Sequence, residues 1–391
     1  MRIPRLVTGD RPRPALAAAA AAAAALAALV SGCGGAAATP NEISVSRGAC
    51  GTGWQHPAAG RQTLQIHNFS AAAADVDLIN PATGAIYAEV ESVAPGTTRP
   101  MPVNLGSGSY AFRCLIEDTG AITGPVRRIG GHVRGAAGIL PVTANDLIGP
   151  VHRYQAYVAA GLGTLVRQVD ALTAQIKAGD LRAARAAWLP AHLTYERLGA
   201  AYGTFGAYDT QIDGRPDGLP GGVHDPSFTG FYRLEYGLWH HQSAAQLTGP
   251  AERLGRDVRA LSRAFPGMEI PYADLGLRTH EILENALQFQ LSGHDDFGSG
   301  TTLATTAANI DATRELLRIL HPLLAPRYHS LPAVYTGLGR LQGLVDAART
   351  GHGWTPAGRL SPAQREQLDS AAGQTLELLA PIAVIFEVRR T

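Results

Sequence analysis

The sequence predicts an α+β chain of two domains, in which an antiparallel β-sandwich precedes an all-α domain of tandem helical bundles. Between residues 63 and 116, apolar and polar residues alternate in short runs separated by Pro and Gly turns, which is typical of strands. From residue 145 onward, apolar residues recur every three or four positions, which is typical of helices. A length of 391 residues also fits about two domains.

The first 32 residues have the layout of a secretory signal peptide. Four Arg residues precede an Ala- and Leu-rich run from Ala15 to Val30. The run ends in Leu29-Val-Ser-Gly-Cys33, which resembles the bacterial lipoprotein signal and implies that Cys33 is lipidated and anchors the mature chain to the cell membrane. A retained membrane helix is the alternative, but the run is short and no positive stop-transfer flank follows it.

The two other cysteines are predicted to form a disulfide. Once Cys33 carries a lipid, Cys50 and Cys114 remain, and an extracytoplasmic, oxidising compartment favours a bond between them. Residues 33–42 are mostly small and are expected to form a tether. Charged residues make up only 17% of the chain, the net charge is +1 and no Lys/Arg-rich run occurs, so we expect no nucleic-acid partner.

Residues 43–140 are predicted to form the β-sandwich. Strands are expected at 63–69, 86–93 and 110–116, with turns at 80–84, 95–96 and 106–108. The segment resembles the cupredoxin-like domain at the front of EfeO-type iron-uptake proteins, through Cys50, Pro95-Gly96 and the strand Gly108-Ser-Tyr-Ala-Phe-Arg-Cys114.

Copper is not expected in this domain. In copper-binding cupredoxins a His and a Met follow the strand Cys within a few residues, whereas here the next are His132 and Met268. A blue-copper centre needs a thiolate and two imidazoles close together, usually with a weak thioether. His56, His67 and Met101 are interpreted either as a weak copper or iron site or as scattered surface residues.

Residues 145–391 are predicted to form the helical domain. Apolar residues from Val151 to Ile176 step by three and four, and Gly179-Asp180 ends this helix and caps the next. Ser361-Pro-Ala-Gln364 is a helix start with a cap and a Pro at the first position. Further helices are expected near 181–204, 227–242, 248–264, 271–292, 302–325, 331–349 and 362–389.

One helical segment, from Phe228 to Trp239, carries a polar pair on an otherwise apolar pattern. Tyr232 and Glu235 lie three residues apart and share a helix face. A buried Glu needs a partner, and two other segments offer a His and a Glu at i, i+4 spacing: His192 with Glu196, and His280 with Glu284. Internal hydrogen bonds between packed helices are the alternative reading of each pair.

The helical domain resembles the imelysin-like domain, also classed as a metallopeptidase family, that forms the C-terminal part of EfeO-type proteins. The matching blocks are Trp188 to Arg197, Phe205 to Arg215, Gly230 to Trp239 and Arg278 to Glu284. The family's proposed metal motif, Gly-x-His-x-x-Glu, falls on Gly230 to Glu235. This chain departs from it, because Tyr232 occupies the His position; a second departure is Ala207, where the family often has an acid, while Asp209 and Asp213 are kept.

The resemblance implies an iron site in the helical domain. The candidate metal ligands are Glu196, Asp213, Tyr232, Glu235, His280 and Glu284. Hard oxygen donors with an imidazole fit iron, as Fe²⁺ or Fe³⁺, better than copper, and a Tyr232 phenolate would suit Fe³⁺. Alternatively, Tyr232 is a core residue whose hydroxyl bonds Glu235 or a neighbouring helix.

The expected function is that of a lipid-anchored, extracytoplasmic iron-binding component of an EfeO-like uptake system. Its expected partners are the membrane, an iron permease and a haem peroxidase of the same system. A metallopeptidase is a less favoured alternative, because His280-Glu-Ile-Leu-Glu284 lacks the second His of a His-Glu-x-x-His motif, so no catalytic residues are assigned. A metal-free binding or scaffold lipoprotein of the same fold is the other alternative.

Overall fold

The computed structural model of the chain describes residues 42–117, 120–351 and 353–387. The predicted signal peptide, the lipidation site Cys33 and all of the predicted tether except Glu42 lie outside the described residues.

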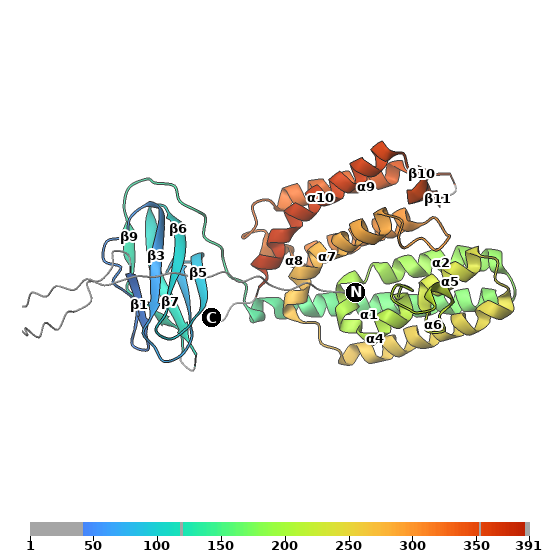
Figure 1. Ribbon diagram of the computed structural model, residues 1–391, viewed down its shortest axis with the longest axis horizontal. Helices are drawn as coiled ribbons and strands as arrows, with labels where there is room; N and C mark the ends of the chain where they lie inside the picture. The colour runs from blue at the N-terminus through green and yellow to red at the C-terminus, as the bar shows by residue number, and fades with distance from the viewer. Residues whose placement is uncertain (1–41, 118–119, 352, 388–391) are drawn as a thin grey trace, which may run out of the picture. The chain divides into compact units, whose positions relative to one another are not determined.

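Two β-sheets occupy residues 42–129 (Figure 1). The strands are β1 (Glu42–Ser46), β2 (Ala49–Thr52), β3 (Gly60–Asn68), β4 (Ala74–Ile79), β5 (Ile86–Val93), β6 (Thr98–Leu105), β7 (Gly108–Ile116), β8 (Ile122–Thr123) and β9 (Arg127–Ile129). One sheet has the order β2-β1-β3-β6 and the other β5-β4-β7-β8, with β9 also paired to β7. The runs predicted at 63–69, 86–93 and 110–116 correspond to β3, β5 and β7.

One strand pair differs from the antiparallel sheets that the sequence predicts. β1 and β3 run parallel, with Ile43 aligned to Ile66, whereas the other pairs are antiparallel among the described strands. The reason is that β2 runs antiparallel to β1 and ends near the start of β1. The strand β3 then enters on the other side of β1 and runs in the same direction. The prediction of a wholly antiparallel sandwich is therefore wrong for this pair.

A single core fills the space between the two sheets. The Trp54 ring lies edge-on to Phe112, with ring centroids 5.2 Å apart, among buried aliphatic side chains of both sheets. A disulfide joins Cys50 on β2 to Cys114 on β7, with an S–S distance of 2.00 Å and both residues buried. The predicted Cys50–Cys114 bond is thus confirmed, and it links one sheet to the other.

Helices dominate the described chain after residue 143. They are α1 (Ala144–Lys177), α2 (Leu181–Glu196), α3 (Tyr202–Phe205), α4 (Ala207–Asp213), α5 (Gly230–Trp239), α6 (Ala244–Ala264), α7 (Tyr272–Asn285), α8 (Thr302–Leu324), α9 (Leu331–Ala347) and α10 (Pro362–Ile385). A π-helix, Ala286–Leu291, continues α7, and a short hairpin pairs β10 (Arg349–Thr350) with β11 (Gly353–Trp354). Short 3₁₀ turns lie at 199–201, 222–224, 265–267 and 357–359.

Local sequence explains where the long helices begin. Thr143, Ser243 and Ser361 each form a capping box with the residue three positions later, which satisfies backbone N–H groups that the first turn leaves free. The start predicted at Ser361 is confirmed. The apolar stripe of α1 is buried along its whole length, as the spacing from Val151 to Ile176 predicts.

The helices form two groups around one continuous hydrophobic core. α1 packs against α2 and α6, and α5 packs against α2 and α6 (Figure 1). α7, α8 and α10 pack with α9 or with one another, while α8 also contacts α2. The helix α10 is long and apolar enough to cross a membrane by composition, but 44% of its apolar window is buried, and it packs on α7 and α9 as a core helix does.

Two segments differ from the predicted helix boundaries. The helix expected over 181–204 ends at Glu196, and a 3₁₀ turn and two short helices, α3 and α4, follow it. The helix expected over 271–292 is α-helical only to Asn285 and then becomes the π-helix. Such π-helical turns recur at functional sites, and both irregular segments border the polar cavity described below.

We predict that loss of the disulfide loosens the β-sandwich and leaves the helices unchanged. The bond closes a span of 64 residues, which on the chain-entropy model stabilises the folded state by about 4 kcal/mol. In a Cys50→Ser/Cys114→Ser variant, hydrogen exchange followed by mass spectrometry should show faster exchange in β3 and β7, with α1 as the internal control. Equal protection of β3 and β7 with and without the bond would contradict this.

Candidate metal centre

The helix α2 carries a His and a Glu one turn apart on its buried face. Asp180 caps this helix by accepting a hydrogen bond from the backbone N–H of Ala183. His192 and Glu196 lie at i, i+4 spacing, and their side chains are only 2% and 5% exposed. The indole N–H of Trp188, one turn earlier, donates to the Phe231 carbonyl at 3.0 Å and so fixes α2 against α5.

A third polar group comes from the last residue of α4, Asp213. Gly230 opens α5 with φ +85°, and a Cβ atom there would lie 2.1 Å from the Ile212 carbonyl oxygen. Only glycine therefore permits this close approach of α5 to the end of α4. The Thr229 hydroxyl strengthens it by donating to the Gln211 carbonyl at 3.0 Å. Gly230 thus lets the end of α4, which carries Asp213, pack closely against α5.

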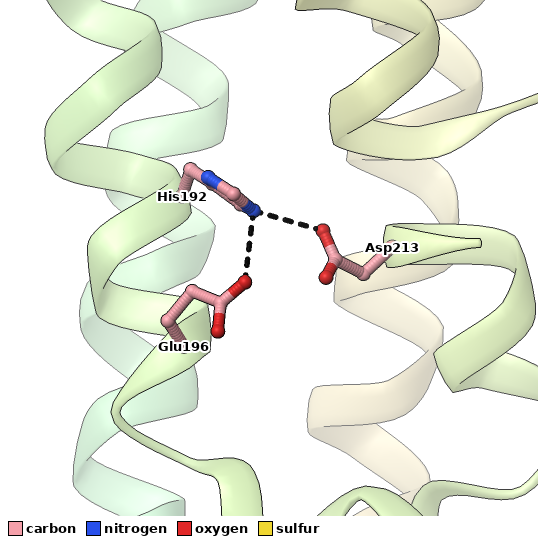
Figure 2. Close-up of side chains that lie close together, drawn as sticks. All are labelled: His192, Glu196 and Asp213. Atoms are coloured by element: carbon pink, nitrogen blue, oxygen red, sulfur yellow. Dashed lines mark hydrogen bonds and ion pairs between the residues drawn. The ribbon is translucent and has the colours of Figure 1, made fainter. Parts of the chain in front are cut away.

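These three side chains converge (Figure 2). His192 Nε2 lies 3.1 Å from Glu196 Oε1 and 3.1 Å from Asp213 Oδ1. One ligand atom from each residue falls within 4.8 Å of the others, and no other group of three or more His, Cys, Asp and Glu side chains does so among residues 42–117, 120–351 and 353–387. These three residues, His192, Glu196 and Asp213, are called the His192 group below. The group offers one imidazole nitrogen and two carboxylate oxygens to a cation.

The imidazole is held mainly by packing. Its ring centroid lies 4.8 Å from that of Trp188, 5.2 Å from that of Phe231 and 5.2 Å from that of Tyr232. His192 Nδ1 has no hydrogen-bond partner within the described part of the chain. The ring orientation that directs Nε2 at both carboxylates is therefore set by neighbouring rings.

The residues of this group hold protons near neutral pH. Burial raises the pKa of Asp213 to about 8, although the charge of His192 acts to lower it. Burial alone would lower the pKa of His192, but the charge of Asp213 and hydrogen bonds to both carboxylates raise it well above 6.5. Next to this group, burial raises the pKa of Asp209 to about 6 although the Tyr195 hydroxyl donates to it at 2.6 Å. A cation that binds here must displace protons.

The Tyr232 ring packs on His192, but its hydroxyl binds a residue outside the group. The hydroxyl donates to Asp295 Oδ2 at 3.2 Å, and burial raises the pKa of the phenol well above 10. The hydroxyl thus has a neighbouring carboxylate as partner, and that partner is Asp295 and not Glu235. Whether Tyr232 ligates a metal stays a prediction.

Glu235, the acid of the family motif, binds a loop. Its Oε1 accepts hydrogen bonds from the backbone N–H groups of Phe297 and Ser299 at 3.1 and 3.0 Å, while Oε2 has no hydrogen-bond partner in the described chain. Burial raises its pKa to about 7. The residue therefore fixes the loop that follows the π-helix, the same loop that carries Asp295.

The second predicted His–Glu pair lies apart from this group. On α7, His280 Nδ1 is 3.5 Å from Glu284 Oε2, and the side chains are 26% and 57% exposed. Neither residue lines the cavity beside the His192 group, whereas their neighbour Glu281 does. The structure therefore brings together Glu196 and Asp213 from the predicted ligands, places Tyr232 alongside them, and leaves His280 and Glu284 as a surface pair.

Sequence reasoning did not include His192 among the ligands, although it singled out the His192–Glu196 spacing. The two His–Glu pairs are indistinguishable by spacing, and only helix packing buries the first. Asp295 and Gln290 were also missed, and no sequence signal could have found them, because their partners are set by the π-helix and the loop after it.

A polar cavity of about 380 Å³ adjoins the group. Glu196, Asp213 and Tyr232 line one part of its wall. Arg215, Arg278, Gln290 and Asp295 are also among its lining residues.

Comparison with known proteins gives a consistent result. The family model described as imelysin, of the M75 peptidases, matches residues 150–379. The chain is 27% identical over 325 residues to the iron uptake system component EfeO of Yersinia pseudotuberculosis serotype I (strain IP32953), covering 83% of this chain and 85% of that protein. It is 28% identical over 328 residues to the protein of the same name from Escherichia coli (strain K12), with the same coverage.

We predict that the metal-free protein loses stability as the pH rises from about 5 to about 8. The folded-state pKa values of Asp213 and Glu235, about 8 and about 7, exceed the ordinary values of 3.8 and 4.5. A raised folded pKa contributes stability that is present at low pH and is lost as the pH rises through that pKa. For Glu235 alone the loss should reach roughly 3 kcal/mol.

Calorimetry in a chelator across this pH range measures the effect. A Glu235→Gln variant keeps the acceptor oxygen and removes the titration, so its profile should be flatter near pH 7. A melting temperature that rises steadily between pH 5 and 8 would contradict the prediction.

Proposed function

Because the chain belongs to the imelysin family, we propose that it is an iron-binding component of an uptake system of the EfeO kind. The observation that carries the proposal is the buried group of His192, Glu196 and Asp213, with one imidazole nitrogen and two carboxylate oxygens within 4.8 Å of one another. Its relatives are named iron uptake system components, which supports iron as the cargo.

The donor set favours iron on chemical grounds. Carboxylate oxygens suit hard cations, and imidazole suits borderline cations. Iron binds both kinds of ligand. Cu⁺ is disfavoured because the soft ligands that select it, thiolate and thioether, are not among the residues that line the cavity. We take His192, Glu196 and Asp213 as the central ligands, and Glu235 as the residue that positions the neighbouring loop.

The β-sandwich is proposed to be cupredoxin-like and free of a blue-copper centre. The sulfur of Cys114, which would have to act as the thiolate, is bound to Cys50. Met101 is wholly buried in the core, whereas His67 binds the Thr98 hydroxyl at an exposed position, so these two do not form a site together. This supports the expectation that the domain is a binding module without copper.

The location and partners of the chain follow as part of the same proposal. Its residues 1–32 have the layout of an export signal, and the sequence before Cys33 resembles a lipoprotein signal. We therefore propose residues 43–140 and 145–391 as two domains held outside the cytoplasm by a lipid on Cys33. A membrane permease would receive the iron, and a haem peroxidase of the same system would be a further partner.

Peptidase activity is the less supported alternative. The 391 residues contain no His-Glu-x-x-His sequence, which in the best-known metallopeptidases places two imidazoles and a base on one helix. The His192 group provides only one imidazole, between two acids. A metal-free scaffold is tested by the next experiment.

We predict that His192→Ala lowers iron affinity by at least about 10-fold. Substituting residues that only orient metal ligands already lowers metal affinity by roughly 10 to 100-fold. His280→Ala is the matched control, since it removes a His of the same i, i+4 pattern from an exposed pair. Titration calorimetry on both variants and on wild type measures the difference. The affinity of wild type should also fall as the pH is lowered below about 8, because protons then compete at Asp213.

Equal affinities in all three proteins would remove these residues from the iron site. An absence of iron binding by wild type, with the fold intact by circular dichroism, would favour the metal-free scaffold.

We predict that Tyr232→Phe leaves the visible spectrum of the ferric protein unchanged. The phenol is held neutral by burial, and its hydroxyl is engaged by Asp295. The variant should instead lose stability on the order of 1 kcal/mol through the lost hydrogen bond. A phenolate-to-iron absorption band that is present in wild type and absent in Tyr232→Phe would overturn this and make Tyr232 a direct ligand. Tyr232→His, which restores the family motif, should shift preference toward divalent metals.

A further inference from the structure

The cavity beside the His192 group is larger than a bare ion needs. Its volume is about 380 Å³, whereas a water molecule occupies about 30 Å³ of the liquid. An ion held by His192, Glu196 and Asp213 would fill one part of this space. The remaining space is lined by other residues, which form a second part of the cavity wall. The chemistry of this wall indicates which ligand binds there.

Two buried oxygen atoms on this wall have no hydrogen-bond partner among the described residues: Gln290 Oε1 and Asp295 Oδ1. Both residues line the cavity, and they are 5% and 4% exposed. The other side-chain polar atoms of these two residues have hydrogen-bond partners. The Gln290 amide donates to Asp295 Oδ2 at 2.9 Å, and the Tyr232 hydroxyl donates to the same oxygen. Buried acceptors of this kind normally have a donor, so the wall lacks a donor that a ligand would provide.

Cationic donors stand next to these acceptors. The Cζ atom of Arg215 lies over the Phe289 ring, 3.5 Å from the ring centroid. Its Nη1 is 3.7 Å from Asp295 Oδ1, and its Nε is 3.4 Å from Asp217 Oδ2. These distances exceed those of good hydrogen bonds, so the guanidinium keeps free donor positions. Arg278 also lines the cavity, and its Nε has no hydrogen-bond partner in the described chain.

The wall does not suit a simple anion. Six acidic side chains line the cavity against two guanidinium groups, and each guanidinium is already paired with acids, so an anion is repelled unless it arrives with a metal. A guanidinium matches a carboxylate in shape and charge. Asp295 Oδ1 and Gln290 Oε1, which accept no hydrogen bond among the described residues, match hydroxyl donors. A metal complex whose organic part carries both carboxylates and hydroxyls satisfies all of these atoms. Its carboxylate binds a guanidinium and its hydroxyls donate to the free oxygens. Its metal neutralises the acids of the His192 group.

We propose that the cavity takes iron as a complex with a small hydroxycarboxylate, the metal lying at His192, Glu196 and Asp213 and the organic acid against Arg215, Gln290 and Asp295. This inference rests on the proposed iron-binding function and specifies the form of the cargo. The hydroxycarboxylate completes the coordination of the metal, and its outer carboxylate binds Arg215. Asp295 and Gln290 accept hydrogen bonds from its hydroxyl groups.

Equilibrium dialysis of the full chain with doubly labelled ferric citrate, ⁵⁵Fe and ¹⁴C-citrate, tests the proposal. Wild type should retain both labels in similar amounts, and citrate without iron should be retained at least about 10-fold less. Arg215→Met keeps an apolar chain on Phe289 and removes the charge. It should retain at least about 10-fold less citrate, the effect of losing charge-assisted hydrogen bonds, while ⁵⁵Fe²⁺ supplied without citrate binds as in wild type.

Arg233→Met is the control, because Arg233 is half-buried on α5 and does not line this cavity. It should retain both labels. Iron retained without citrate by wild type would overturn the hydroxycarboxylate proposal and leave the proposed function standing. Retention of neither label, with ⁵⁵Fe²⁺ also unbound, would overturn the proposed function. Equal citrate retention by Arg215→Met and wild type would remove Arg215 from the site.

Discussion

A buried imidazole shared by one buried and one largely buried carboxylate is the constraint on which the helical domain depends. Taking His192, Glu196 and Asp213 out of water is costly, and they are tolerated because each neutralises and hydrogen-bonds another. Two features of the surrounding structure hold these residues in place. Aromatic rings hold the imidazole, and the absence of a side chain at Gly230 lets the end of α4 approach α5. A bound cation would replace the protons that now neutralise the acids.

Glu235 fixes the loop that carries Asp295, one of the residues that line the cavity. It holds the backbone of Phe297 and Ser299, and the Phe297 ring packs on Tyr232 with centroids 5.2 Å apart. Tyr232 in turn donates to Asp295. A chain of contacts thus runs from Glu235 through the loop to Asp295. Tyr232 binds this loop through both its hydroxyl and its ring, and so helps to form the cavity wall beside the His192 group.

The family name and the names of the relatives point to different chemistry, and the site helps to choose between them. One fold hosts many functions, so function has to be argued from the site. Here two acids that line a polar cavity, Glu196 and Asp213, meet one imidazole, and arginines and amides are among the other lining residues. These groups are suited to holding a metal and its companion anion. They support binding as the proposed function more strongly than hydrolysis.

The sequence by itself determined the elements and the paired cysteines. Period-two and period-3.6 patterns are local, so strands β3, β5 and β7 and the long helices were predictable, as were the cap at Ser361 and the Cys50–Cys114 bond. Tertiary structure decided the rest. Burial distinguishes His192–Glu196 from the identically spaced His280–Glu284, and burial depends on which helices pack together. Asp295 meets Tyr232 across 63 residues only because a π-helix and a loop turn it inward, and no local pattern encodes such a contact.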